Sequence, residues 1–174
     1  ATEVEARQNS REAITDYLLH GTVRNAVNLP NLDANAYALV KPYLGLGEKL
    51  GRLAAALAPK SNERLVVTYG GKATELPTDP ITRSVLRGFL ESAGGQDVNY
   101  VNVRTLAGAL GLLVEEVKSN EETDYNEWLH VAVFSGDQKI SVGGTFYGSQ
   151  SHPRIVRINS QPVEVVPAGV LFIM

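Results

Sequence analysis

The sequence contains no cysteine and only three histidines among its 174 residues. Without thiols, the chain can form no disulfide, no thiolate nucleophile and no cysteine-based zinc or iron–sulfur site. The histidines, His20, His130 and His152, do not have the H-x-x-x-H or H-E-x-x-H spacing of a metal site. We therefore expect no metal site, and the lack of thiols fits a reducing, cytoplasmic setting.

The chain also lacks an excess of basic charge and any long apolar run. Sixteen basic residues against nineteen acidic ones give a net charge of −3, whereas a nucleic-acid surface usually carries a basic balance or stripe. No apolar run approaches the roughly 18 residues that indicate a membrane span. The N-terminal stretch ATEVEARQNS has no apolar signal-peptide region. We expect neither a nucleic acid nor a membrane as a partner.

The one methionine is Met174, the last residue, and it ends the apolar run GVLFIM. A β-rich apolar end with no polar residue after it is typical of a strand inside a larger domain. We therefore expect the chain to be a fragment of a longer protein.

What the sequence does contain is typical of a globular α+β protein, with 44% hydrophobic and 20% charged residues. Helical spacing of apolar residues predicts helices over 1–20, 33–58, 80–93 and roughly 100–110. Alternating, β-branched stretches predict strands over 64–71 and 113–117, and hairpins around Gly136-Asp137 and Asn159-Ser160. This mixture predicts an α+β fold in which a mixed or antiparallel sheet packs against helices.

The stretch GLGEKLG, whose glycines are Gly45, Gly47 and Gly51, is similar to a phosphate-binding glycine loop but lacks its pattern. The dinucleotide-binding fingerprint needs glycines spaced G-x-G-x-x-G after a buried strand, and Leu50 occupies the third glycine position. The residues before it instead indicate a helix with Asp33 as its N-cap. We therefore interpret the glycines as points where another backbone approaches this helix closely.

The predicted helix over 80–93 begins with strong signals, with Asp79 as the N-cap and Pro80 at the first helical position. Arg83 and Arg87 are four residues apart on this helix and therefore share one face. A solvated helix surface is the simpler interpretation of these two arginines.

Arg154 and Arg157 lie in the first predicted strand of the second hairpin. An offset of three places them on opposite faces of a sheet, so they cannot both line one pocket unless a bulge intervenes. A strand-edge arginine paired with a local acid is the simpler interpretation of Arg154.

An ordered series of short stretches resembles the regulatory portion of bacterial-type D-3-phosphoglycerate dehydrogenase, the NAD-dependent first enzyme of serine biosynthesis. The series covers nearly the whole chain, and its order is more specific than any single motif. The stretches are AVNLP at 26–30, KPYLGLGEKLGRLAAALAP at 41–59, VTYGG at 67–71, ITRSVLRGFL at 81–90, VNYVN at 98–102, VGGTFYG at 142–148 and PRIVRIN at 153–159. The chain departs from the family pattern at Val103 and Arg104, so the surface beside that helix is expected to differ.

The resemblance implies three segments. Residues 1–24 resemble the last helix of the dehydrogenase's substrate-binding domain, residues 25–160 the intervening or allosteric substrate-binding domain, and residues 161–174 the linker and first strand of an ACT domain. The catalytic histidine and the NAD-binding glycine loop of the family would precede Ala1. The resemblance therefore implies a fragment with no catalytic, cofactor-binding or metal-binding residues. The parent enzyme oxidises 3-phospho-D-glycerate to 3-phosphonooxypyruvate with NAD.

The family's allosteric role also implies a homo-oligomer and an anionic effector, such as the substrate phosphate or a carboxylate. A guanidinium fork suits an oxyanion, so the implied effector-binding residues are Arg154, with Arg83 or Arg87 from a neighbouring chain. Two alternatives stay open: the same domain type in the β portion of an iron–sulfur L-serine dehydratase, and a free-standing anion-binding module. The predicted helix over 1–20 and the stretch NAVNLP at 25–30 favour the dehydrogenase.

Overall fold

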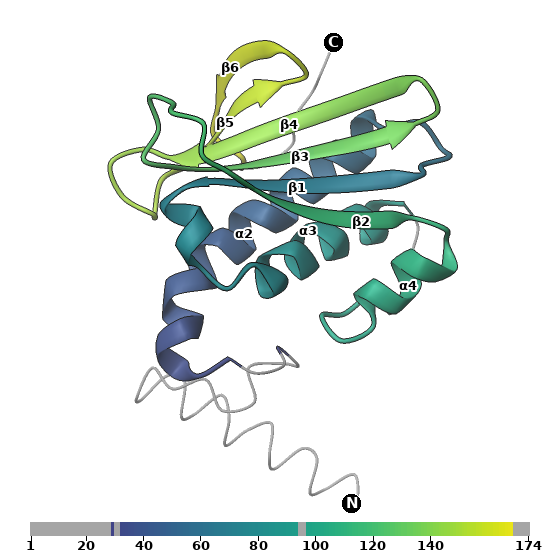
Figure 1. The fold of residues 1–174 in the computed structure, drawn as a ribbon, viewed down its shortest axis with the longest axis horizontal. Helices are drawn as coiled ribbons and strands as arrows, with labels where there is room; N and C mark the ends of the chain where they lie inside the picture. The colour runs from purple at the N-terminus through teal and green to yellow at the C-terminus, as the bar shows by residue number, and fades with distance from the viewer. Residues whose placement is uncertain (1–28, 30–31, 94–96, 169–174) are drawn as a thin grey trace, which may run out of the picture.

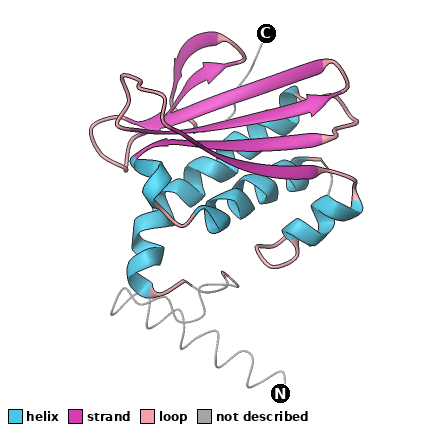
Figure 2. Ribbon diagram, viewed as in Figure 1, coloured by secondary structure: helices cyan, strands magenta, loops and turns pink. Residues whose placement is uncertain are grey.

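The computed structural model describes residue 29 and residues 32–93 and 97–168, which form two layers. The described helices lie on one face of a six-stranded sheet and leave the other face uncovered (Figures 1 and 2). In chain order the elements are α2 (Ala34–Leu57), β1 (Arg64–Gly71), the 3-10 turn η1 (Lys72–Glu75), α3 (Thr78–Ser92), α4 (Val103–Ala109), β2 (Leu113–Ser119), β3 (Glu127–Ser135), β4 (Gln138–Phe146), β5 (Pro153–Ile158) and β6 (Gln161–Val165). This arrangement confirms the predicted α+β class.

The sheet is mixed, with the strand order β2-β1-β3-β4-β5-β6. β1 and β2 are parallel because the chain passes from one to the other through α3 and α4, and the other neighbouring strands are antiparallel. The two predicted hairpins are confirmed. Gly136 (φ +57°) and Asn159 (φ +53°) occupy their turns in the left-handed conformation that tight two-residue hairpins need.

The core lies between the sheet and the pair α2 and α3. Along β1 every second side chain, from Leu65 through Val67 to Tyr69, is fully buried among residues of the helices. The Tyr69 hydroxyl lies 2.5 Å from Thr82 Oγ1 and donates a hydrogen bond to the Thr78 carbonyl at 3.0 Å. Both partners lie in α3, so this buried tyrosine joins the central strand to that helix.

α2 begins and continues as predicted. The Asp33 carboxylate accepts a hydrogen bond from the Ala36 N–H at 2.7 Å, so Asp33 is the N-cap. Pro42 lies inside the helix, which runs on to Leu57. The stretch GLGEKLG is therefore wholly helical, and the interpretation of it as a packing helix rather than a phosphate loop is confirmed.

α2 and α3 meet at backbone distance through reciprocal glycines. A Cβ atom on Gly51 of α2 would lie 2.1 Å from the Val85 carbonyl oxygen of α3. A Cβ atom on Gly88 of α3 would in turn lie 2.1 Å from the Glu48 carbonyl oxygen of α2. Neither position has room for a side chain, so the two glycines permit the contact between the helices.

The other two glycines of the stretch behave differently from each other. A Cβ atom on Gly47 would lie 2.4 Å from Ser84 Oγ, so this glycine also faces α3. A Cβ atom on Gly45 would meet no atom within 4 Å. The predicted close approach is therefore confirmed for Gly47 and Gly51 and wrong for Gly45, because Gly45 lies on the side of α2 away from α3.

The start of α3 corrects the sequence prediction. The helix begins at Thr78 with Pro77 at the N-cap position, so Asp79 is not the N-cap. The Asp79 carboxylate instead pairs with Arg83 Nε at 2.7 Å and with an Arg104 terminal nitrogen at 2.6 Å. Burial alone would raise the pKa of the Asp79 carboxyl, but the bonds to these two arginines outweigh burial and lower the pKa.

Arg104 lies where the sequence departs from the family pattern, and it joins three elements. Besides Asp79 of α3, its guanidinium pairs with Glu116 of β2 at 2.8 Å. The short helix α4 is thereby held against both α3 and β2.

Two predictions fall outside the described residues: the helix over 1–20 and the strand over 169–174. The domain boundaries after residues 24 and 160 stay predictions, and β6, just past the second boundary, pairs with β5 in the same sheet. None of the helices in the described ranges has the length and apolarity that a membrane crossing requires.

We expect Gly51→Ala to destabilise the fold by about 1–3 kcal/mol or more, the cost of overpacking a tight core, because its methyl group would overlap the Val85 carbonyl. Gly45→Ala on the same helix is the matched control. Its methyl group meets nothing, and the better helix propensity of alanine should stabilise the chain by about 0.5–1 kcal/mol. Urea denaturation compares the variants, and equal midpoints would contradict the close helix contact.

Candidate functional site

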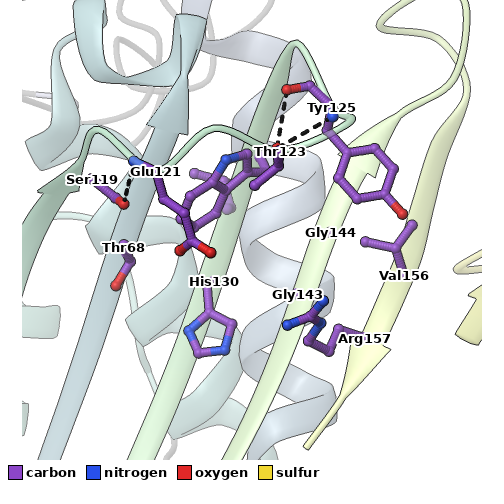
Figure 3. A pocket seen from close by; sticks show the side chains of 12 residues that line it. Thr68, Ser119, Glu121, Thr123, Tyr125, His130, Gly143, Gly144, Val156 and Arg157 are labelled. Carbon is purple, nitrogen blue, oxygen red and sulfur yellow. Dashed lines mark hydrogen bonds between the residues drawn. The ribbon is translucent and has the colours of Figure 1, made fainter. Parts of the chain in front are cut away.

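A hollow of about 290 Å³ lies on the uncovered face of the sheet, beside the loop over 120–126 that joins β2 to β3 (Figure 3). It is lined by Thr68, Ser119, Glu121, Thr123, Tyr125, Trp128, Leu129, His130, Gly143, Gly144, Val156 and Arg157. Thr68 and His130 alternate with core residues along β1 and β3, so their side chains point away from the helices.

The strand register places four residues of the hollow in one row across the sheet. Thr68 of β1 pairs with His130 of β3, His130 with Gly143 of β4, and Gly143 with Arg157 of β5. A Cβ atom on Gly143 would lie 3.4 Å from the Arg157 Cβ and 3.7 Å from the His130 Cδ2. Because Gly143 has no side chain, the bottom of the hollow has an open space between the His130 imidazole and the Arg157 guanidinium.

A β-bulge in β5 decides which face Arg154 and Arg157 occupy. Arg154 pairs with Thr145 and Arg157 with Gly143, and the register shifts between these pairs. Thr145 and Gly143 are two residues apart on β4 and share a face, so the two arginines share a face as well. The sequence left this question open, and the bulge answers it.

The two arginines of β5 are nevertheless held differently. Arg154 is half-buried, its guanidinium lies 5.5 Å from the ring centre of Tyr147, and it donates a hydrogen bond to the Pro153 carbonyl at 2.9 Å. The Arg157 side chain is exposed, and its guanidinium makes no hydrogen bond or ion pair within the described ranges. The hollow includes Arg157 but not Arg154.

Arg83 and Arg87 lie in α3, on the helix-covered side of the sheet. Arg83 pairs with Asp79 and donates to the Tyr100 carbonyl at 2.7 Å. Arg87 pairs with Glu91 at 3.1 Å, and its guanidinium lies 5.3 Å from the Tyr100 ring centre. Within one chain, therefore, the structure does not bring these arginines together with Arg154.

The His130 imidazole is kept neutral by its surroundings. Burial lowers its pKa, and the positive charges of Lys139 and Arg157 lower it further, while the Glu121 carboxylate acts in the opposite direction. His130 therefore offers the hollow a neutral ring with one donor and one acceptor nitrogen near pH 7.

Trp128 forms an aromatic wall of the hollow. Its indole lies directly over Gly70, where a Cβ atom would overlap the ring at 1.8 Å. The indole Nε1 is buried and donates to no acceptor in the part of the chain that the structure describes. A buried donor without an acceptor is rare in proteins.

The loop over 120–126 is shaped by its own side chains. The Glu121 N–H donates to Ser119 Oγ at 3.1 Å, and the Tyr125 N–H donates to Thr123 Oγ1 at 3.2 Å. These bonds hold Glu121 and Tyr125 at the rim of the hollow (Figure 3). Among the described residues, no group of three or more histidines and carboxylates is placed to hold a metal ion.

Sequence reasoning found the arginines of β5 but missed the hollow. It gave no functional role to His130 or to any residue of the loop over 120–126. The hairpin turn at Gly136-Asp137 already predicts that His130 faces Gly143, and that pairing was the available signal. The contribution of Arg157 depends on the bulge, which no local pattern marks.

We expect the pH dependence of stability to include a contribution from His130. Its pKa is lower in the folded than in the unfolded chain, so unfolding takes up a proton once the pH falls below about 6.5. Its stabilising contribution is complete above that pH and is lost below it, at no more than about 1.4 kcal/mol per pH unit. Urea denaturation at pH 7.5 and pH 5.5 should show a smaller loss for His130→Gln than for the unaltered chain. Equal losses of stability in the variant and the unaltered chain would show that folding does not lower the pKa of His130.

Comparisons with known proteins match the segment that holds most of the described helices and strands. A family model for the D-3-phosphoglycerate dehydrogenase intervening domain matches residues 39–159. The D-3-phosphoglycerate dehydrogenase of Archaeoglobus fulgidus is 32% identical over 147 residues, which are 84% of this chain and 28% of that protein. The protein of the same name from Synechocystis is 32% identical over 166 residues, 95% of this chain and 30% of the relative. The one from Bacillus subtilis is 29% identical over 173 residues, 97% of this chain and 33% of the relative.

This chain therefore spans 28% to 33% of the length of these relatives. The matched segment runs from the first turns of α2 to the turn between β5 and β6, and it is more than half of the chain. The chain belongs to the D-3-phosphoglycerate dehydrogenase intervening-domain family.

Proposed function

We propose that the chain is a regulatory and assembly domain of a cytoplasmic D-3-phosphoglycerate dehydrogenase and has no catalytic activity by itself. The observation that carries this proposal is the match of the intervening-domain family over 39–159, which includes nearly every described element. In this proposal the parent enzyme oxidises 3-phospho-D-glycerate with NAD. No comparison favours the serine dehydratase or the free-standing anion-binding alternative.

The helix contact supports the view that NAD binds elsewhere in the parent. A dinucleotide loop offers free backbone N–H groups at the start of a helix. The glycines of GLGEKLG instead lie in the interior of α2, and Gly47 and Gly51 pack against α3. This stretch therefore has no free N–H groups for a pyrophosphate.

An anionic effector fits Arg154 better than the arginines of α3. The Tyr147 ring orients its guanidinium, and among the described residues only the Pro153 carbonyl of its own strand accepts a hydrogen bond from it. Arg83 and Arg87 already pair with carboxylates of α3. In this proposal Arg154 is the principal anion-binding group. Arg83 or Arg87 contributes from a neighbouring chain of a homo-oligomer, where a second guanidinium would strengthen the binding.

We expect the 174-residue chain to show no saturable NAD binding by calorimetry and no reduction of NAD with 3-phospho-D-glycerate. A longer protein that includes this chain should show both. Deleting residues 39–159 from that protein should alter its oligomeric state in light scattering. Micromolar NAD binding by the chain alone would overturn the assignment.

We expect Arg154→Ala to weaken the binding of inorganic phosphate by about tenfold or more, since a hydrogen bond to a charged group contributes about 1.5–3 kcal/mol. Lys60→Ala, which removes an exposed cation near the end of α2, is the matched control and should leave the affinity unchanged. Calorimetric titration with phosphate measures both variants. Equal affinities for Arg154→Ala and the unaltered chain would remove Arg154 from the effector site.

A further inference from the structure

We propose that the hollow on the uncovered face of the sheet binds a small zwitterionic amino acid, with the carboxylate on Arg157 and the ammonium group on Glu121. The apolar side chain of this ligand lies against the aromatic wall formed by Trp128 and Tyr125. The site is distinct from the Arg154 site and does not depend on the proposed function.

The two charged groups of the hollow lie on either side of His130 and do not pair with each other. Both act on the imidazole electrostatically, in opposite directions, so both lie near the same ring. No ion pair joins Glu121 to Arg157, and neither forms one with another residue in the described ranges. Figure 3 shows the Glu121 carboxylate pointing toward His130, and the Arg157 side chain beside Gly143.

This charge arrangement selects a zwitterion over a simple ion. Glu121 would repel an anion bound to Arg157, and Arg157, together with Lys139 near His130, would repel a cation bound to Glu121. A ligand with both charges joins the two groups across the space between them. The neutral His130 ring adds a hydrogen bond without changing the balance of charge.

The walls and the size fit an apolar side chain. Trp128, Tyr125 and Val156 line the hollow, and aromatic faces bury apolar groups effectively. The volume of about 290 Å³ lies just below the roughly 300–1,000 Å³ found for ligand pockets, so it suits a single small metabolite.

A larger side chain at Gly143 would fill the hollow without disturbing β4. Gly143 lies in the middle of β4 outside the left-handed backbone region, and a Cβ atom there would make only ordinary contacts of 3.4 Å and 3.7 Å. Valine is favoured in strands. Gly143→Val therefore puts a branched side chain between His130 and Arg157 while the strand keeps its pairing.

The test is calorimetric titration of the 174-residue chain with L-phenylalanine. We expect saturable binding that is lost when L-phenylalaninamide or N-acetyl-L-phenylalanine, each lacking one of the two charges, is used. Arg157→Gln, Glu121→Gln and Gly143→Val should each weaken binding about tenfold or more, since each removes a charged partner or the space. Lys60→Gln, which removes an exposed cation that does not line the hollow, is the control and should bind normally.

Each other outcome overturns the proposal. Absent binding to the unaltered chain refutes the site, and equal binding of the N-acetyl compound shows a simple anion site. Unchanged affinity in both Arg157→Gln and Gly143→Val places the ligand elsewhere. Circular dichroism and urea midpoints show that the variants are folded. Because the readout uses neither NAD nor phosphate, a failure here is distinct from a failure of the proposed function.

Discussion

The fold depends on the close approach of α2 and α3, whose backbones meet through Gly51 and Gly88. At this distance the two helices form one thin layer, and a single face of the sheet is enough to cover both. The side chains that fill the core come from alternate positions of β1 and β3 and lie against this layer. The same alternation points the remaining side chains of β1 and β3 away from the helices. These side chains lie on the uncovered face of the sheet.

Two irregular features of the sheet, a glycine in β4 and a bulge in β5, create the hollow on the uncovered face. Gly143 removes one side chain from the row that Thr68, His130 and Arg157 share. The bulge in β5 turns Arg157 to the face that strict alternation would deny it. Bulges often redirect side chains in this way at functional sites. A regular six-stranded sheet of the same composition would have neither the hollow nor the free guanidinium.

Local signals predicted the elements well, and non-local contacts account for the rest. Hairpin turns and the Asp33 cap depend on neighbours in sequence, so the residues themselves predict them. The spacing of the glycines indicated a close approach to α2, but not that α3 makes it. Asp79 shows the limit, because Asp-Pro is a strong capping signal, yet two arginines bind this carboxylate in the structure. The hollow required the register of four strands and a bulge, and neither follows from residue spacing. The family resemblance was found because seven stretches occur in the family's order.

The parallel pairing of β1 with β2 has a consequence for how the chain folds. The antiparallel hairpins form between residues close in sequence, whereas Arg64 meets Leu113 only after α3 and α4 have brought the chain back. Closing so long a loop costs entropy before any contact compensates for it. The pairing of β1 with β3, in which Arg64 faces Phe134, closes a still longer loop. We infer that both pairings of β1 form after the hairpins. As an edge strand with exposed Leu113 and Val117, β2 is held mainly by β1 and by Arg104, which pairs with Glu116 of β2 and Asp79 of α3.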